Sequence, residues 1–167
     1  MAEREKFIDE MKLNYEGVFN LKELLALIKK FFLDKGYEYK ETKKNVVVRE
    51  HGKEISIEYE PWKDVDETAW VQVVLRVYMK NVIDIEVERD GIMVGVNQGK
   101  ITMVFDAWVV TEMESRWENK PVLYAMKHLI NKWVSVGYLK TFDGIVVGDT
   151  TKLYKLVKAY LNLQHYR

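Results

Sequence analysis

The stretch from Ala69 to Glu112 constrains the fold most, because apolar and polar residues alternate along much of it. Successive side chains of an extended strand point to opposite faces, so this alternation predicts strands with one apolar face. In the first predicted strand, 70–79, one side consists of Val71, Val73, Leu75, Val77 and Met79. The other side carries Trp70, Gln72, Val74, Arg76 and Tyr78.

Three turns are predicted to fold this stretch into a four-stranded antiparallel meander. Asp90-Gly91 and Gln98-Gly99 contain residues that readily adopt left-handed backbone conformations, and a three-residue loop, 80–82, supplies the remaining turn. The predicted cross-strand pairs are Met79–Ile83, Tyr78–Asp84, Arg76–Glu86, Ile85–Val96, Val87–Val94, Val96–Ile101 and Val94–Met103. This register predicts one common apolar face that includes Val73, Ile85, Val94 and Phe105.

The other segments predict an α+β fold. A helix is expected from Leu21, with Asn20 and Glu23 as a capping box and Gly36 at its end. A second helix is expected over 119–136, and a third from Asp149 or Thr150 onwards. Strands are expected at 12–19, 37–41, 45–50 and 53–60, and a turn at His51-Gly52 pairs Val48 with Ile55 and Val46 with Ile57. We therefore expect a curved antiparallel sheet of about seven strands, with about three helices packed mainly on one face.

Length and composition predict a single domain. The 167 residues are 48% hydrophobic, which suits one substantial core and is too short for two ordinary domains. We expect one domain over residues 1–167, with residues 1–10 as a charged and flexible N-terminal extension. Those residues lack the apolar core of a signal peptide, and no run approaches the roughly 20 apolar residues that span a bilayer.

Charge and cysteine content narrow the expected partners. The 26 basic residues balance the 26 acidic ones, so net charge favours neither nucleic acid nor an anionic membrane. Residues 50–90 hold 11 acidic against 5 basic residues, whereas 113–167 hold 4 acidic against 9 basic ones. The absence of cysteine excludes disulfides and thiolate chemistry, and it is compatible with a cytoplasmic location. Abundant Lys and Glu and only three Gln are typical of heat-adapted proteins.

Five further segments are considered together: Tyr15–Phe19 before a leucine-rich helix, Lys35–Glu41, Asp84–Gly91, Gly99–Ile101 and Arg116–Glu118. Together these segments resemble a family of small archaeal hypothetical proteins with no assigned activity, and the likeness spans most of the chain. The resemblance implies a single archaeal α+β domain. It implies no chemistry.

No motif predicts catalysis, a cofactor or a metal site. The three histidines, His51, His128 and His165, are far apart and form no ligand pair. Asp84, Glu86 and Glu88 offer oxygen ligands for a hard cation, but a solvated strand face is the favoured interpretation. A carboxylate cluster at Glu112, Glu114 and Glu118 beside Arg116 could serve acid–base chemistry, but no second constellation supports it.

The second face of the predicted sheet carries the candidate binding residues: Trp70, Arg76, Tyr78, Asp106 and Trp108. This face is too apolar at its ends for a plain solvent surface, and its cover is either the protein's own helices or a partner. The leading hypothesis is a non-enzymatic interaction domain that binds a protein or a second copy through this face. The alternatives are a small-ligand carrier or enzyme with a pocket between sheet and helices, and a nucleic-acid binder using the basic C-terminal helices.

Overall fold

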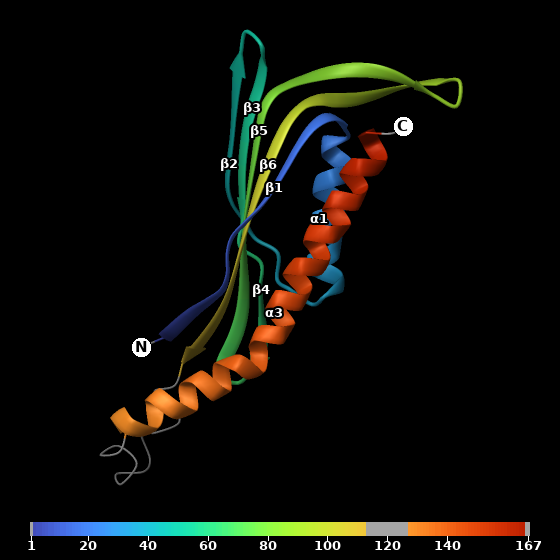
Figure 1. Ribbon diagram of the computed structural model, residues 1–167. Coiled ribbons are helices and arrows are strands. Elements are labelled where there is room, and N and C mark those ends of the chain that lie inside the picture. Colours follow the sequence, from blue (N-terminus) through green and yellow to red (C-terminus); the bar gives the residue numbers. More distant parts are fainter. Residues whose placement is uncertain (1, 113–126, 166–167) are drawn as a thin grey trace.

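One antiparallel sheet and two helices make up the described part of the chain. The computed structural model describes residues 2–112 and 127–165, with side chains for 3–112, 137 and 140–165. The strands are β1 (Ala2–Phe19), β2 (Glu41–Arg49), β3 (Gly52–Tyr59), β4 (Trp62–Asp66), β5 (Ala69–Arg89) and β6 (Ile92–Glu112). The helices are α1 (Leu21–Asp34) and α3 (Lys127–His165). The sheet has the order β1-β6-β5-β3-β2, with β4 beside the start of β5, and both helices lie on one face (Figure 1).

The α+β class and the antiparallel sheet are confirmed, but the predicted meander is wrong. β5 and β6 form one hairpin whose strands have 21 residues each. Its turn is the predicted Asp90-Gly91, and the pairs Val87–Val94 and Ile85–Val96 flank it as expected. The other two predicted turns do not exist, which removes two of the predicted strands. With β4 as an additional strand, the described sheet has six strands rather than about seven. The remaining predicted pairs are replaced by Met79–Ile101, Arg76–Val104 and Tyr78–Thr102, among others.

A β-bulge occupies the place of the two missing turns. Lys80 pairs with Lys100 and Ile83 with Gln98, so two residues of β5 lie opposite Gly99 alone. Asn81, one of the two, has a φ of 53°. Gly99 is required because a Cβ there would lie 2.9 Å from the carbonyl oxygen of Lys80. Beyond this bulge the hairpin arches over the N-terminus of α1 and the C-terminus of α3 (Figure 1).

The predicted common apolar face holds only for the part of the hairpin before the bulge. From Val71 to Met79, buried side chains alternate with half-buried ones and with the exposed Tyr78, and Met103, Phe105, Ala107 and Val109 are buried with the same set. Val94 does not continue this face, because it is eleven residues from Phe105 in one unbroken strand and so lies on its opposite side.

Helix α1 forms as predicted. Asn20 is its N-cap and accepts a hydrogen bond from the backbone N–H of Glu23 at 3.2 Å. Gly36 follows the helix with a φ of 79°, the left-handed conformation that favours glycine. The buried side of α1 consists of Leu24, Ile28 and Phe32.

Helix α3 corrects the prediction of two separate C-terminal helices. It is a single helix of 39 residues that continues through Gly137 and Gly148. Thr150 does not cap a new helix, and its hydroxyl donates to the carbonyl of Val146 at 2.6 Å within α3. The buried residues Val146, Leu153, Val157 and Leu161 keep one stripe against the sheet, which compensates for the glycines. The predicted helix start at Asn119 and Pro121 lies outside the described residues.

Three further predictions near the sheet edges are corrected. Residues 2–10, expected as a flexible extension, belong to strand β1 and pair with β6. The β2–β3 turn lies at Glu50-His51, so Val46 pairs with Ile55 and Val48 with Lys53. Of the strand predicted at 37–41, residues 37–40 form only an isolated bridge between Glu38 and Trp62, and Glu41 is the first residue of β2.

Candidate interaction site

The five candidate residues share one surface, which we call the open face: the side of the sheet opposite α1 and α3. Trp70, Arg76 and Tyr78 alternate along β5 with buried residues of the helix side, and Asp106 and Trp108 do the same on β6. Within the described residues no helix lies over this face. The structure therefore brings the five residues to a common surface, although their surroundings differ.

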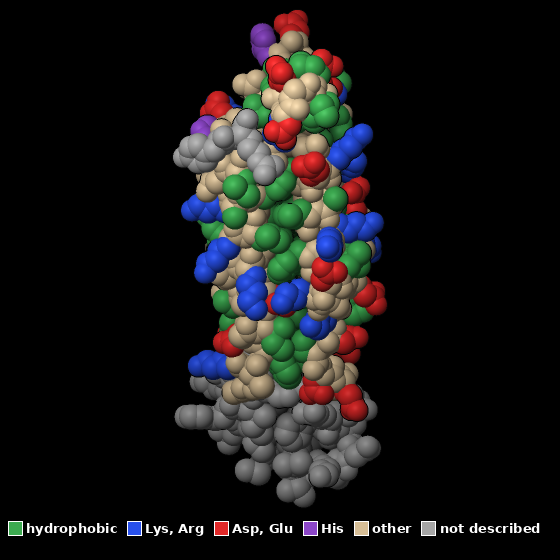
Figure 2. All heavy atoms as spheres, turned by 90° about the vertical axis from the view of Figure 1, so that its right-hand side faces the viewer, with side chains coloured by type: hydrophobic (Ala, Val, Ile, Leu, Met, Phe, Trp, Pro, Cys, Tyr) green, Lys and Arg blue, Asp and Glu red, His purple; other side chains and the backbone are tan. Residues whose placement is uncertain are grey.

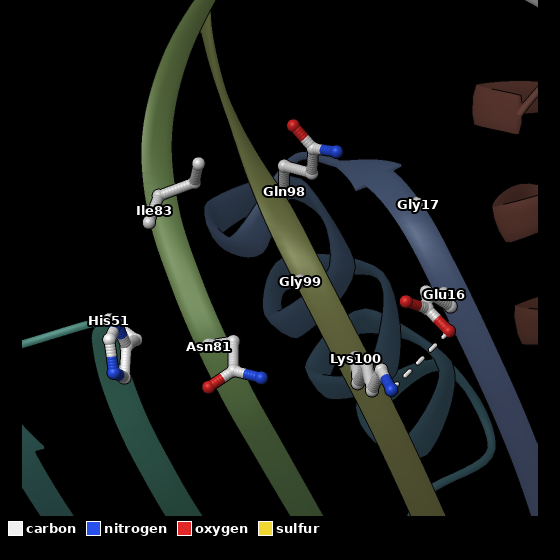
Figure 3. A pocket seen from close by; sticks show the side chains of 8 residues that line it. All are labelled: Glu16, Gly17, His51, Asn81, Ile83, Gln98, Gly99 and Lys100. Atoms are coloured by element: carbon white, nitrogen blue, oxygen red, sulfur yellow. Dashed lines mark ion pairs between the residues drawn. The ribbon is translucent and has the colours of Figure 1, made fainter. Parts of the chain in front are cut away.

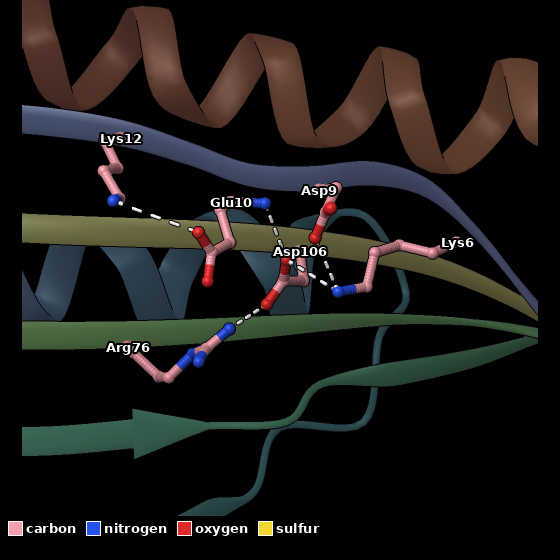
Figure 4. A network of polar contacts seen from close by, with 6 residues as sticks. All are labelled: Lys6, Asp9, Glu10, Lys12, Arg76 and Asp106. Carbon is pink, nitrogen blue, oxygen red and sulfur yellow. Dashed lines mark hydrogen bonds and ion pairs between the residues drawn. The ribbon is translucent and has the colours of Figure 1, made fainter.

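Asp106 is at the centre of a polar network on this face (Figure 4). Its carboxylate accepts a hydrogen bond from Arg76 and another from the backbone N–H of Glu10 at 2.8 Å. The ammonium of Lys6 lies 3.5 Å from the same carboxylate. The Asp106 side chain is only 3% exposed, so its carboxylate is buried beneath the groups that bind it.

Strand β1 covers Asp106 with Lys6 and the backbone of Glu10, because the strand bulges between these residues. Its register with β6 shifts twice between Lys6 and Met11, and Glu10 has a φ of 49°. The bulge aims the backbone N–H of Glu10 at Asp106. The pKa of Lys6 is raised, first by its hydrogen bond to Asp9 and then by the charges of Asp106 and Asp9. A carboxylate with all of these partners is suited to hold β1 in place.

Trp108 is also engaged within the chain. The guanidinium carbon of Arg4 lies 4.6 Å from the centroid of its ring, and the ammonium of Lys6 lies 4.7 Å from it. Arg4 also donates to the side-chain oxygen of Gln72 at 3.0 Å, and Gln72 donates to Glu60 at 3.3 Å. The Trp108 end of the open face is thus covered by cationic side chains of the same molecule.

Of the five candidate residues, Tyr78 is the most accessible to a partner. It is 41% exposed and lies beside a hollow of about 140 Å³. The hollow is lined by Asn45, Val47, Glu54, Ile55, Ser56, Tyr78, Met79 and Lys80, from β2, β3 and β5. Small-molecule pockets usually measure about 300–1,000 Å³, so this hollow suits a single side chain of a partner.

A larger hollow of about 340 Å³ lies at the bend of the β5–β6 hairpin (Figure 3). Its lining residues are Glu16, Gly17, His51, Asn81, Ile83, Gln98, Gly99 and Lys100. Lys100 and Glu16 form an ion pair of 3.6 Å across one wall. The lining residues come from β1, β5, β6 and the β2–β3 turn, and Figure 3 shows that their side chains do not converge on one point. The bulge explains this hollow, and no acid–base pair distinguishes it.

A third hollow, of about 590 Å³, lies under the arch of the hairpin near the start of α1. Its polar groups bind one another: Asn97 accepts from the backbone N–H of Leu21 at 3.1 Å and donates to Asp84 at 2.7 Å. Asp84 is also paired with Lys53 at 3.2 Å. The prediction that Asp84 pairs with Tyr78 and Glu86 with Arg76 is therefore wrong.

The space between sheet and helices is filled by side chains. Leu24, Ile28 and Phe32 of α1 and Leu153 and Val157 of α3 are fully buried there. Tyr37 donates a hydrogen bond to the buried carboxylate of Asp149 at 3.1 Å, and burial raises the pKa of Tyr37. This interface therefore has the character of a core. The hollow recorded between β1 and α3 measures about 140 Å³, which is below the usual size of a small-molecule pocket.

Neither metal binding nor membrane insertion is indicated in the part of the chain that the structure describes. Among these residues no three His, Cys, Asp or Glu side chains are grouped closely enough to hold a metal ion. No described helix is both long and apolar enough to cross a bilayer. Glu114, Arg116 and Glu118 of the proposed carboxylate cluster lie outside the described residues.

The basic residues of the C-terminal part that have described side chains lie among acidic ones on the helix side of the molecule. Lys152, Lys155 and Lys158 are exposed on α3. Figure 2 shows the helix side of the molecule, where basic side chains line both helices with acidic ones among them and hydrophobic side chains between the helices.

Arg4, Lys6 and Glu10 were not predicted to belong to the site, because residues 1–10 were expected to form an extension. Two bulges interrupt the alternation of this segment, so its strand character is not evident from periodicity. The charged residues that flank Phe7 and Ile8 were the available signal.

Comparison of the chain with protein-family models, with curated proteins and with solved structures yields no match. The function must therefore be inferred from the geometry of this molecule.

Proposed function

We propose that the chain is a non-enzymatic interaction domain that binds a protein partner through the Tyr78 end of its open face. The observation that carries the proposal is an aromatic side chain, 41% exposed, beside a hollow that fits one side chain. Aromatic anchors next to such hollows are typical of the few residues that dominate a protein interface.

The surroundings of Tyr78 favour a protein over other partners. Glu54 and Lys80 line the same hollow with Asn45 and Ser56, so the rim offers both charges and neutral hydrogen-bonding groups. A polar rim around a small apolar centre is the usual anatomy of a protein–protein interface. Phosphate recognition would instead require a surface with one dominant positive sign.

Of the five residues predicted from the sequence, three are not proposed as direct contacts of the partner. Asp106, Arg76 and Trp108 bind groups of their own chain, so they position the surface and do not supply its free contacts. Trp70 extends the same face towards β4. We place this activity in the cytoplasm, with the absence of cysteine as support.

Site-specific photocrosslinking tests the proposal. A photoreactive phenylalanine analogue replaces Tyr78 in one variant and Ile92 in another, since Ile92 is also exposed, at 66%, but lies at the hairpin tip. In cells of the source organism, the Tyr78 position is expected to give one discrete protein adduct, and the Ile92 position is expected to give none. The adduct should decrease when Lys80→Glu is added, because that change alters the rim of the hollow.

Equal adduct patterns at both positions would contradict the proposal. An adduct of twice the chain's mass would show that the partner is a second copy, and a nucleic-acid adduct would favour the nucleic-acid alternative.

A further inference from the structure

Strand β2 leaves one edge of the sheet without a partner. The sheet ends at β2, which pairs with β3 on its inner side, and Figure 1 shows it away from both helices. From Lys43 to Arg49 its register with β3 is unbroken. Val46 and Val48 are 48% and 74% exposed, although they are β-branched residues with high strand propensity. A regular edge with three valines at its centre is a template for a further strand.

The β2–β3 register determines which backbone groups are free at this edge. Arg49 and Gly52 close the two-residue turn, so they form a hydrogen-bonded pair of the antiparallel ladder. The pattern alternates along the ladder, and Lys44, Val46 and Val48 therefore direct their N–H and C=O groups away from β3. An added strand would bond to these three residues.

Self-pairing of β2 is complementary in one particular register. If a two-fold axis passes through Val47, Val46 lies opposite Val48 of the other copy, and Val47 lies opposite its own copy. Lys44 then lies beside Glu50 of the other copy, on both sides of the axis. A two-fold axis at Val46 would instead place Lys43 opposite Arg49, a pair of like charges.

We propose that the chain forms a symmetric dimer in which β2 pairs antiparallel with β2 of a second copy, with the two-fold axis at Val47. Such an axis is perpendicular to the sheet, so the helices of both copies lie on one side and the open faces on the other. The two sheets become one continuous sheet. The dimer covers the exposed side chains of Val46 and Val48, which accounts for their presence at an edge.

The dimer is independent of the proposed function but adjacent to its site. Asn45 and Val47 line the hollow beside Tyr78, so the second copy would extend this surface across the two-fold axis. The proposed function concerns a face and this inference concerns an edge. Their tests can therefore fail separately.

Sedimentation measurements test the dimer with matched variants. The unmodified protein is expected to sediment as a dimer. Val46→Lys and Val48→Lys are each expected to raise the dimer dissociation constant at least about tenfold, because a charge enters the apolar centre of the interface. Ile92→Lys makes the same chemical change at another exposed position and should leave the dimer intact. The exposed positions allow all three variants to fold, which unfolding midpoints will verify.

Charge reversal tests the register itself. Lys44→Glu and Glu50→Lys should each weaken the dimer about tenfold, since each places like charges together at two positions. Mixing the two variants should restore a heterodimer, because the two carboxylates of the Lys44→Glu copy then meet the two lysines of the Glu50→Lys copy. A monomer at all concentrations would overturn the proposal. Equal loss in the Ile92→Lys variant, or no recovery on mixing, would also overturn it.

Discussion

The two edges of the sheet differ in what they leave free for a further strand. β1 has two register shifts near Ile8, and Tyr154 of α3 donates to the carbonyl of Lys12 at 3.4 Å. β2 has an unbroken register from Lys43 to Arg49 and no such contact from α3 in the described structure. Both edges carry several charged residues. The comparison teaches that register and anchoring of the backbone, more than composition, decide whether an edge can receive another strand.

The anchor of β1 is Asp106, and its removal should have the largest effect. Asp106→Ala leaves Arg76, Lys6 and the backbone N–H of Glu10 without their acceptor. We expect a loss of about 2–3 kcal/mol in the free energy of unfolding, less than for a fully buried pair because Arg76 and Lys6 are partly exposed. Urea unfolding measures the loss, and hydrogen exchange should show faster exchange over residues 4–12.

The matched control for this variant is Asp9→Ala. Asp9 binds Lys6 at 2.7 Å but is 73% exposed, so its loss should cost less than about 0.5 kcal/mol. Similar losses in the two variants would show that Asp106 does not anchor β1.

Alkaline pH should weaken the β2 side of the sheet. Tyr39 and Tyr59 lie at the base of β2 with ring centroids 5.0 Å apart, and burial raises the pKa of both phenols. The folded state therefore holds these protons more tightly than the unfolded state, in which tyrosine ionises near pH 10. The full contribution is present below that pH and is lost as the pH rises above it.

The expected slope is up to about 1.4 kcal/mol per pH unit for each tyrosine. Urea unfolding between about pH 9 and 11 measures it. Tyr59→Phe should reduce the slope, whatever its effect on stability at neutral pH. An unchanged slope would show that other groups cause the alkaline loss.

Relief of backbone strain in the β1 bulge should have the smallest effect. Glu10 has a φ of 49°, and its side chain has only a 3.9 Å ion pair with Lys12. Glu10→Gly should raise the free energy of unfolding by about 0.5 kcal/mol, because glycine adopts this conformation without steric cost and keeps the N–H that Asp106 accepts. Glu5→Gly, in a regular part of β1, should lower it by about 0.5–1 kcal/mol. Urea unfolding of both variants should therefore give opposite signs, and equal signs would contradict a strained bulge.

Much of the local structure was predictable from short-range patterns. The cap at Asn20, the stop at Gly36 and the turn at Asp90-Gly91 depend on neighbouring residues, and the structure contains all three. The alternation in β5 also placed Trp70, Arg76 and Tyr78 on one face. Alternation needs only the backbone of a single strand, which explains why it was informative.

The face shared by the candidate residues was predictable from the sequence, but the contacts of these residues were not. Asp106 and Trp108 are covered by Lys6, Arg4 and the Glu10 backbone, which belong to a segment almost 100 residues away in the sequence. Two bulges in that segment hid its strand character. Tyr78 is free because the residues of β1 cover Asp106 and Trp108 but not Tyr78, and this difference depends on the tertiary structure.

The sequence by itself determined the apolar face of β5 before the bulge, the caps of α1 and the Asp90-Gly91 turn. The tertiary structure decided whether Asn81 and Gly99 would form turns or a bulge. Left-handed backbone conformations serve both purposes equally well, so local energetics cannot distinguish them. The distinction comes from β1, which pairs with β6 on both sides of Gly99 and holds it extended. In the same way, packing of α3 against β1 and β6 carried one helix through glycines that would otherwise favour a stop.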